Sequence, residues 1–421
     1  MSTRPVVPEP IVITGIGMIT SVGRDREAVW HAVRHGRSNF HFLRGLRGLP
    51  DDEFVGATVP LEGMRKGRVK AIPLCGIAAQ EALQDAQVDW GEVDRDRFAC
   101  SISAHVGDSR GVDQLLGRAE PAVGDEVPWW QQAFANTACS EIGAKYDLRG
   151  PRLCHSTACA SSLISVVAAA RAIRDHQCDI ALAGGGDAIE PLLVAGFNRM
   201  RVLAKDPDPN RACRPFDRSR KGFVFGEGAA MLVIERLSHA LRRGARIYAE
   251  ISATKTLSQA HHVTGLDADS DSLHHLIRLA LKSAGLKPED LGYINAHGTG
   301  TAQNDVAEAK GICRALGPAS RRTCVSATKS ILGHMIHGAG AAELAVTVLA
   351  MRDGFAPPTL NLTDPDPACG FDCLPLTGRD HRFQHGLKLA LAFGGHLVAV
   401  LLSRWNDSAT GFQYPATTKA A

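Results

Sequence analysis

One cysteine of this sequence stands where its sulfur could act as a nucleophile. Cys159 lies in the run Ser156 to Ser162, which is rich in small residues, and residues 160–175 follow with a strong helix pattern. We therefore expect Cys159 at the N-terminus of a helix, where unpaired backbone N–H groups and the helix dipole lower a thiol pKa and stabilise the thiolate. Cysteine is the best nucleophile among side chains at neutral pH and accepts acyl groups in thioester exchange.

Two histidines are predicted to follow strand ends. His297 stands in the run Asn295 to Thr301, which ends one predicted strand, and His334 closes the run Thr328 to His334, which follows another. The interval between them leaves room for one helix and one strand. Because α/β folds gather catalytic groups at strand ends, we expect both imidazoles at one site.

A lysine and a glycine pair complete the set. Lys329 lies five residues before His334, and Phe393-Gly394-Gly395 interrupts a late strand pattern. Glycines in such a position let backbone N–H groups approach a ligand closely. One cysteine, two histidines, a lysine and a Gly-Gly turn are together suited to acyl transfer through a carbanion.

Short apolar runs alternate with helical patterns along most of the chain. The predicted strands are Ile11–Ile16, Phe98–Val106, Ile180–Ala183, Ala229–Ile234, Ile247–Ala253, Gly292–Ala296, Thr323–Ser326 and Leu387–Phe393. The predicted helices are Pro73–Ala86, Ala160–Asp175, Ser272–Ala284, Asp305–Leu316 and Ala339–Arg352. This alternation favours an α/β protein with buried, largely parallel sheets.

At this point the sequence resembles the β-ketoacyl-acyl-carrier-protein synthases, the condensing enzymes of the thiolase-like superfamily. The resemblance covers nearly the whole chain, from Val12-Ile-Thr-Gly-Ile-Gly to Phe393-Gly-Gly. Between those ends, the runs Arg214 to Arg218, Gly222 to Gly228 and Arg243 to Glu250 also look like segments of the family. Each motif alone is moderately specific for this family, whereas the order and spacing of all the motifs together are strongly specific for it.

The resemblance implies a five-layer αβαβα thiolase-like fold made of two similar halves. We expect residues 1–250 to form the half that carries the nucleophile and residues 251–421 the half that carries both histidines. The Cys-His-His set resembles the elongating, type II synthases, whereas initiating synthases pair cysteine with histidine and asparagine. A thiolase would carry a second cysteine near its C-terminus in a Cys-x-Gly setting, which this sequence lacks.

The implied activity is that of an acyltransferase, a β-ketoacyl synthase that joins malonyl-ACP to an acyl chain held on Cys159 by decarboxylative Claisen condensation. Backbone N–H groups of Cys159 and Phe393 would hold the oxyanion, with Phe393 also serving as a gate. His297 and His334 would stabilise the enolate as neutral donors. The remaining expected roles are support of the histidines by Lys329, support of Lys329 by Glu343, and binding of the pantetheine arm by Thr299 and Thr301.

The resemblance also implies partners. We expect no bound cofactor, because the substrates travel on the 4′-phosphopantetheine of an acyl carrier protein. Arg65, Lys66, Arg68 and Lys70 match the place where the family docks that acidic carrier by charge steering. The chain is expected to form a homodimer, or a heterodimer with a subunit similar to a chain-length factor.

Two stretches depart from the family pattern. The family usually has Phe-Gly-Phe-Gly-Gly-Thr-Asn at its last motif, where this chain has Leu391-Ala-Phe-Gly-Gly-His396-Leu397. The usual Leu-Gly-Ala-Ala-Gly after the second histidine is replaced by Ile336-His337-Gly338-Ala-Gly340. These departures favour a specialised polyketide, polyene or modified fatty-acid pathway over a housekeeping role in fatty-acid synthesis.

Two other functions stay open. The chain could be a non-catalytic partner subunit of a ketosynthase heterodimer that keeps the site as a relic. It could also be a serine hydrolase, since Gly107-Asp-Ser109-Arg-Gly111 matches a nucleophile elbow.

Gly15-Ile-Gly17 follows a strand as a dinucleotide loop would, but the third glycine and the acidic partner are missing. The sequence shows no complete zinc-like ligand set, so we expect no metal.

Composition limits the remaining classes. The 421 residues include 45% hydrophobic and 22% charged residues, the balance of a globular protein of two domains or lobes. A net charge of +3 argues against general nucleic-acid binding. No run approaches the roughly 18 to 20 apolar residues of a membrane helix, and the N-terminal residues do not resemble a secretory signal. Eleven irregularly spaced cysteines favour a reducing compartment, so we expect a cytoplasmic protein without membrane contact.

Overall fold

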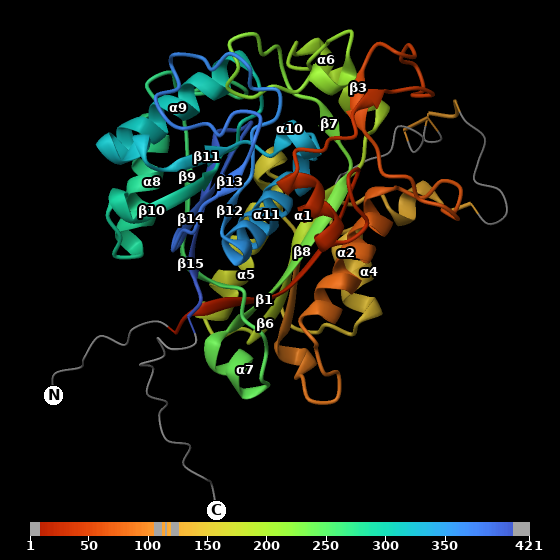
Figure 1. Ribbon diagram of the computed structural model, residues 1–421. Helices are drawn as coiled ribbons and strands as arrows, with labels where there is room; N and C mark the ends of the chain where they lie inside the picture. The colour runs from red at the N-terminus through yellow and green to blue at the C-terminus, as the bar shows by residue number, and fades with distance from the viewer. Residues whose placement is uncertain (1–8, 105–111, 114–115, 119–125, 407–421) are drawn as a thin grey trace, which may run out of the picture.

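Two groups of five strands with the same pairing pattern form the framework of the protein (Figure 1). The structure is a computed structural model that describes residues 9–104, 112–113, 116–118 and 126–406. Among these residues, ten strands join in one mixed sheet. In sheet order, the first group comprises β5 (Arg152–Leu153), β4 (Phe98–Ala104), β6 (Ile180–Asp187), β8 (Gly228–Arg236) and β1 (Ile11–Thr20). The second comprises β11 (Cys324–Ser326), β10 (Leu291–Asn295), β14 (His385–Ala392), β15 (His396–Arg404) and β9 (Ala249–Ser258).

The two groups repeat each other strand by strand. In the first, β4 pairs in parallel with β5 and β6, and β8 pairs antiparallel with β6 and β1. In the second, β10 pairs in parallel with β11 and β14, and β15 pairs antiparallel with β14 and β9. The groups meet through β1 and β9, where Val12 lies opposite Glu250 and Ile13 opposite Ala249. The chain is therefore built from two similar halves, as expected.

Ten helices, counted among the described residues, surround and separate the strands. They are α1 (Arg26–Arg34), α2 (Ala71–Asp85), α4 (Thr137–Lys145), α5 (Ser161–Arg174), α6 (Pro191–Arg199), α7 (Leu237–Arg242), α8 (Asp271–Ser283), α9 (Ala302–Leu316), α10 (Lys329–Leu332) and α11 (Ala339–Asp353). Two small sheets lie outside the main one: β2 (His41–Phe42) with β3 (Val55–Ala57) and β7 (Phe225–Gly226), and β12 (Phe355–Ala356) with β13 (Arg379–Asp380).

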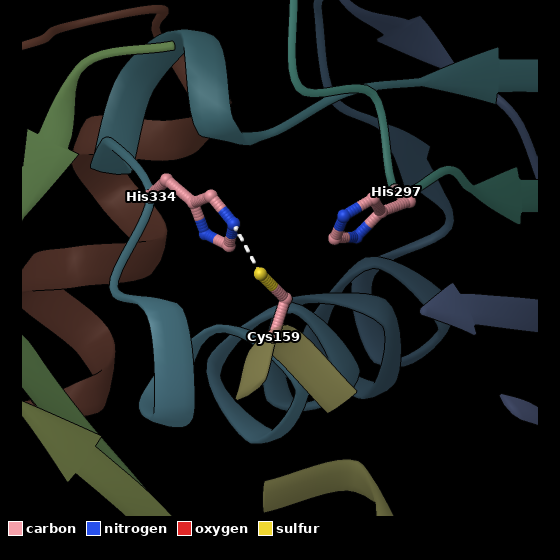
Figure 2. Close-up of side chains that lie close together, drawn as sticks. All are labelled: Cys159, His297 and His334. Carbon is pink, nitrogen blue, oxygen red and sulfur yellow. Dashed lines mark hydrogen bonds between the residues drawn. The ribbon is translucent and has the colours of Figure 1, made fainter. Parts of the chain in front are cut away.

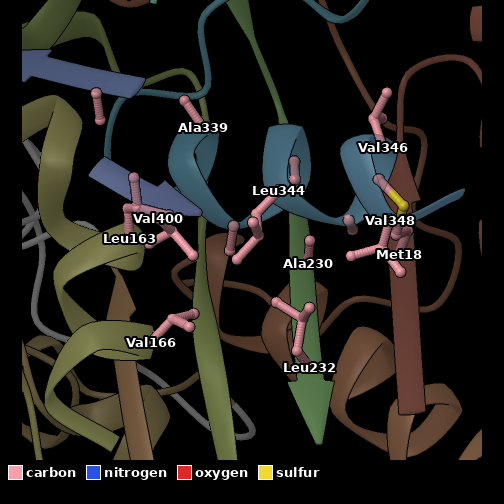
Figure 3. Close-up of a cluster of buried hydrophobic side chains, with 14 of the residues drawn as sticks. Met18, Leu163, Val166, Ala230, Leu232, Ala339, Leu344, Val346, Val348 and Val400 are labelled. Carbon is pink, nitrogen blue, oxygen red and sulfur yellow. The ribbon is translucent and has the colours of Figure 1, made fainter. Parts of the chain in front are cut away.

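The central layer consists of α5 and α11. Helix α11 contacts β8 of the first half and β14 of the second, so it lies between the two strand groups. Residues 339–351 of α11 are all buried, so this part of the helix has no face exposed to solvent. Figure 3 shows Leu344 and Val348 of α11 within an apolar cluster that includes Leu163 of α5 and Leu232 of β8. Helices α2 and α4 cover the first half from outside, and α8 and α9 cover the second, which gives five layers.

The glycines of the first strand serve close packing. Gly15 and Gly17 lie inside β1, which continues to Thr20. A Cβ atom at Gly17 would overlap the backbone of α2 at Ala78, and one at Gly15 would overlap it at Ala82. The apparent dinucleotide motif is therefore part of a strand on which a helix lies unusually close. This finding explains why two glycines interrupt an apolar run.

The predicted elements agree with the structure in place but not always in extent. Each predicted strand and helix has a counterpart whose boundaries differ by a few residues, and residues 105–106 of the predicted strand Phe98–Val106 lie outside the described residues. The expectation of largely parallel sheets is wrong, because five of the nine strand pairings within the described ten-stranded sheet are antiparallel. Strand β15 was not predicted, since residues 387–402 resemble a single interrupted strand rather than a hairpin. The division at residues 250 and 251 stays a prediction, and Glu250 lies inside β9.

Two further sequence expectations concern the chain as a whole. All eleven cysteines lie in described residues and are free thiols, so no disulfide framework is present there. Within residues 9–104, 112–113, 116–118 and 126–406, no helix is both long enough and apolar enough to cross a membrane.

The close contact between β1 and α2 yields a stability prediction. The Gly17→Ala variant should lower the free energy of unfolding by about 1–3 kcal/mol, because the added methyl group forces strand and helix apart. Urea denaturation checks this value. The matched control is Gly76→Ala in α2, where a Cβ meets no atom within 4 Å; there the stability should stay equal or rise slightly. Equal stability of Gly17→Ala and the wild type would contradict the packing argument.

Candidate active site

Cys159 lies in a tight turn immediately before α5. The turn is a 3-10 segment, Ala158–Ala160, and α5 starts at Ser161. Ala158 has a φ of 47°, a left-handed conformation that non-glycine residues rarely adopt. Such strain persists only where the surroundings enforce it, and it often marks a functional turn. The predicted placement of Cys159 at a helix N-terminus is therefore correct.

The two predicted histidines lie on either side of the cysteine sulfur (Figure 2). Nε2 of His334 is 3.0 Å from Sγ of Cys159. The rings of His297 and His334 have centroids 5.6 Å apart and are nearly perpendicular, at 82°. One half of the chain thus supplies the sulfur and the other half supplies both imidazoles. All three side chains are at most 7% exposed.

Burial gives the thiol an unexpected charge state. Desolvation raises the pKa of Cys159 to about 12, although Lys329 and the backbone N–H of Cys159 itself act in the opposite direction. Our expectation of a thiol pKa lowered by the helix N-terminus is therefore wrong. The helix end lies at the sulfur as predicted, but removal from water outweighs its effect. The resting nucleophile is a neutral thiol that must lose its proton during attack.

The same burial keeps both imidazoles neutral. Desolvation, followed by the charge of Lys329, holds the pKa of His297 well below its ordinary value. His334 is affected in the same way, again by desolvation first and Lys329 second. A neutral imidazole can donate a hydrogen bond from one ring nitrogen and accept with the other. Both rings are therefore in the state that donation to a substrate oxygen requires.

Lys329 and Glu343 hold the loop that carries His297. Nζ of Lys329 donates to the His297 carbonyl oxygen at 2.6 Å and to Oε1 of Glu343 at 2.7 Å. The same Nζ lies 3.4 Å from Nδ1 of His297. Because an ammonium can only donate, this contact favours an accepting Nδ1 and leaves the ring proton on Nε2. Lys329 and Glu343 are thus in contact with each other and with the His297 loop, and their supporting roles in catalysis stay predictions.

Two charged residues at the site were not singled out from the sequence. Glu308 of α9 accepts the backbone N–H of His297 at 2.6 Å and that of Gly298 at 2.8 Å; burial raises its pKa to about 7. Lys388 of β14 lies 2.6 Å from the second carboxylate oxygen of Glu343. A lone charged residue inside an apolar run is the sequence signal that could have identified Lys388.

A cavity of about 370 Å³ opens onto the three reacting side chains. Its wall includes Thr299, Thr301 and Phe393, so the residues predicted to bind pantetheine and to gate the site share one space with Cys159. Oγ1 of Thr299 and Oγ1 of Thr301 are 2.9 Å apart. Their binding role and the oxyanion role of the Phe393 backbone stay predictions.

An aromatic cluster surrounds the gate. The ring of Phe393 stacks on Phe197, with centroids 6.0 Å apart. Phe223 packs edge-on against both Phe197 and the ring of His334, at 5.3 and 5.0 Å. The imidazole of His334 is thus confined by an apolar wall, which explains much of its desolvation.

Three of the predicted docking residues lie beside carboxylates of the same chain. Arg68 pairs with Glu141, at 2.8 Å between Nη1 and Oε1, and Lys70 pairs with the buried Glu227. Lys66 is 78% exposed and lies 3.8 Å from a carboxylate oxygen of Glu126. Arg65 is also exposed. The docking surface stays a prediction, and Arg65 and Lys66 are its exposed residues.

The sequence also raised the questions of a serine nucleophile and of a metal site. Ser109, the nucleophile of the hydrolase alternative, lies outside the described residues. Cys159, His297 and His334 form a group whose potential ligand atoms lie within 4.8 Å of one another, close enough to hold a metal ion. Acyl transfer requires the same proximity, so this geometry alone does not indicate a metal.

Family models match most of the chain. Residues 70–240 match the N-terminal domain of the β-ketoacyl synthases, and residues 248–363 match their C-terminal domain. The chain is 35% identical over 412 residues to the tetracenomycin polyketide synthase ketoacyl synthase alpha subunit of Streptomyces glaucescens, covering 94% of this chain and 97% of that one. It is 34% identical over 413 residues to 3-oxoacyl-(acyl-carrier-protein) synthase 2 of Coxiella burnetii, covering 94% and 99%.

The chain belongs to the β-ketoacyl synthase family. It is therefore an acyltransferase, and the thiolase-like fold is confirmed by solved structures of the family. One is AntDE:AntF, a type II polyketide synthase acyl-carrier protein in complex with its ketosynthase, with a TM-score of 0.87, 28% identity, and coverage of 95% of this chain and 100% of that one. Another is the ishigamide ketosynthase/chain length factor, with a TM-score of 0.85, 29% identity, and coverage of 95% and 100%.

The raised thiol pKa of this β-ketoacyl synthase can be tested by alkylation. The rate constant for reaction of Cys159 with iodoacetamide should keep rising up to about pH 10.5, where an ordinary thiol has already levelled off, because the thiolate fraction grows until the pH reaches the thiol pKa. Mass spectrometry of the peptide that contains Cys159 gives the rate at each pH. A short peptide with blocked ends and one cysteine serves as the reference, since its rate should level off above the ordinary pKa of about 8.5. A plateau for Cys159 below pH 8 would show that the site stabilises the thiolate.

Proposed function

We propose that this chain elongates an acyl group held on Cys159 by decarboxylative condensation with a malonyl thioester. The observation that carries the proposal is the placement of the Cys159 sulfur and two neutral imidazoles in one buried cavity. A non-catalytic subunit would have no need of this arrangement. The intact set of side chains therefore favours an active synthase over the relic alternative.

The first half-reaction transfers the acyl group to the enzyme. Sγ of Cys159 attacks the thioester carbonyl, a new C–S bond forms, and the bond to the pantetheine sulfur breaks. The thiol proton ends on the departing pantetheine sulfur. Nε2 of His334, 3.0 Å from Sγ, is the group placed to relay it. Because the thiol is neutral at rest, this relay is coupled to the attack.

The second half-reaction forms the carbon–carbon bond. The malonyl C–CO₂ bond breaks, carbon dioxide leaves, and the electron pair moves into an enolate. Nε2–H of His297 and a ring N–H of His334 donate to the enolate oxygen. The enolate carbon attacks the acyl carbonyl, the C–S bond to Cys159 breaks, and the thiolate regains a proton from solvent.

The carrier of both substrates is proposed to be an acyl carrier protein. The support is the family itself and the exposure of Arg65 and Lys66, which suits an acidic partner. A pantetheine arm would reach Cys159 along the cavity wall that holds Thr299 and Thr301. No resident cofactor is part of the proposal, since the chemistry uses only the thioester and the side chains.

We further propose a specialised polyketide, polyene or modified fatty-acid pathway, with a homodimer or a chain-length-factor partner. The support is the pair of departures beside the site. His337, where the family has glycine, pairs through Nδ1 with Asp187 at 2.8 Å. His396 opens β15 directly after the Phe393-Gly394-Gly395 turn. Incubation with carrier proteins bearing acyl groups of different length, followed by intact-mass measurement, would rank the substrates.

Histidine variants test the two half-reactions separately. His297→Ala should still acquire the acyl group on Cys159, while carbon dioxide release from malonyl carrier protein falls by about 100-fold or more, because an enolate donor is lost. His334→Ala should lose decarboxylation similarly and acylate more slowly, because the proton relay is also removed. Intact mass reports acylation, and labelled carbon dioxide reports the second step.

Cys159→Ser is the control for acylation at other cysteines. A variant that decarboxylates at the wild-type rate would refute the role of its histidine. Labelling of Ser109 by a fluorophosphonate, together with activity that survives alkylation of Cys159, would favour the hydrolase instead.

The docking surface can be tested by charge reversal. A double variant, Arg65→Glu with Lys66→Glu, should lower kcat/KM for acyl carrier protein by about 10-fold or more, and the loss should shrink at high salt. The rate with a small pantetheine thioester should stay unchanged, because that substrate needs no docking. Arg278→Glu with Lys282→Glu, at two exposed positions of α8, provides a charge-matched control. Equal losses with both substrates would show damage to the cavity rather than to docking.

A further inference from the structure

A second lysine is buried behind the reacting side chains, and no step described above uses it. Lys388 lies in β14 and has no exposed surface. Its neighbours Leu387 and Leu389 belong to the apolar core beneath the outer helices, whereas Ala390 and Ala392 belong to the core around the central helices. Since strand side chains alternate between faces, Lys388 is directed toward the central layer and the site.

The ammonium of Lys388 is surrounded by oxygen atoms. Nζ lies 2.6 Å from Oε2 of Glu343 and donates to the Ala296 carbonyl oxygen at 3.1 Å. The side-chain oxygen of Asn295 is 3.4 Å away. A buried ammonium is costly unless such partners offset its lost hydration. The oxygen atoms around Nζ therefore hold the Lys388 side chain in a defined position.

These contacts extend to His297. Glu343 accepts from Lys329 with one oxygen and pairs with Lys388 through the other. Lys329 holds the carbonyl oxygen of His297, and Lys388 holds that of Ala296, the residue before it. Two consecutive carbonyl groups of the histidine loop are thus fixed by two ammonium groups that share one carboxylate.

We propose that Lys388 is a positioning residue for His297, holding the loop and Glu343 in the arrangement that the condensation needs. The inference rests on the proposed function, in which His297 donates to the enolate. Lys388 touches no reacting atom, so its effect passes through the backbone of residues 295–297 and through Glu343. The second half-reaction should therefore depend on Lys388, whereas acylation of Cys159 should not.

The charge of Lys388 adds a second effect. The charged and titratable groups around it are Glu343 of α11, Lys329 of α10, Glu308 of α9, and the two imidazoles. Lys388 contributes to the lowered pKa of both imidazoles: after desolvation and Lys329 for His334, and after desolvation, Lys329 and His334 for His297. Removal of its positive charge should raise both imidazole pKa values. Neutral imidazole is then lost at a higher pH, so the acid limb of decarboxylation moves upward.

The experiment compares Lys388→Met, which removes charge and donors, with Lys388→Gln, which keeps amide donors without the charge. Carbon dioxide release from malonyl carrier protein is measured between pH 5.5 and 9, and acylation of Cys159 is measured by intact mass. Lys255→Met in β9, a half-buried lysine away from the site, is the matched control. NMR titration of labelled histidines follows the imidazoles without turnover.

For Lys388→Met we expect a fall in kcat for decarboxylation of about 10-fold or more, a KM within twofold of the wild type, and normal acylation. Lys388→Gln should recover part of kcat but share the upward shift of the acid limb. If Lys388→Met does not fold, Lys388→Gln carries the test through that shift. Wild-type kcat and an unshifted acid limb in the folded variants would overturn the inference.

Failure of the proposed function would give a different result. A wild-type protein that releases no carbon dioxide refutes the condensation, while the histidine titration still reports on Lys388. In that case, unchanged imidazole pKa values in Lys388→Gln would be sufficient to overturn the inference about Lys388.

Discussion

Removal of the reacting side chains from water is the constraint on which the rest of the site depends. Cys159, His297 and His334 are almost fully buried between the two halves. An isolated thiolate or imidazolium is expensive in such surroundings, so the neutral forms predominate. Neutral imidazoles are what enolate stabilisation needs, whereas a neutral thiol is not yet a nucleophile. Burial therefore favours the second half-reaction at rest and makes the first depend on proton relay during attack.

Burial also determines how the charged side chains beside the histidines are paired. Glu343 pairs with both lysines beside the imidazoles, Lys329 and Lys388. Desolvation lowers the pKa of Lys388 to about 8, against the opposing effect of Glu343. Their positive charge lowers the imidazole pKa values further, so the groups that orient His297 also keep it neutral. Breaking such a buried pair leaves an uncompensated charge, which typically costs about 3–5 kcal/mol. Orientation and protonation state thus have a common cause, and they should respond together to substitution.

The sequence predicted those features that depend on local patterns. Cys159 before a helix, and the two histidines after strands, were identified because each signal lies within a few residues. The thiol pKa was predicted with the wrong sign, because the desolvation that decides it comes from segments far apart in the chain. Lys388 was missed for a similar reason, since a lone lysine in an apolar run looks like an interruption until Glu343 is found beside it. The pairing of Arg68 with Glu141 and of Lys70 with Glu227 was not predicted, because the partners are distant in sequence.

The repeated topology explains how the sulfur and one imidazole come to lie 3.0 Å apart. In the first half, β5 is followed by Cys159 and then by the central helix α5. In the second half, β11 is followed by α10, by His334 and then by the central helix α11. Cys159 and His334 therefore occupy equivalent places, each shortly before its central helix. The turns that precede α5 and α11 are in contact, which brings the two residues together. His297 follows β10, whose counterpart in the first half is β4. The third reacting group is therefore also placed by a strand end of the duplicated framework.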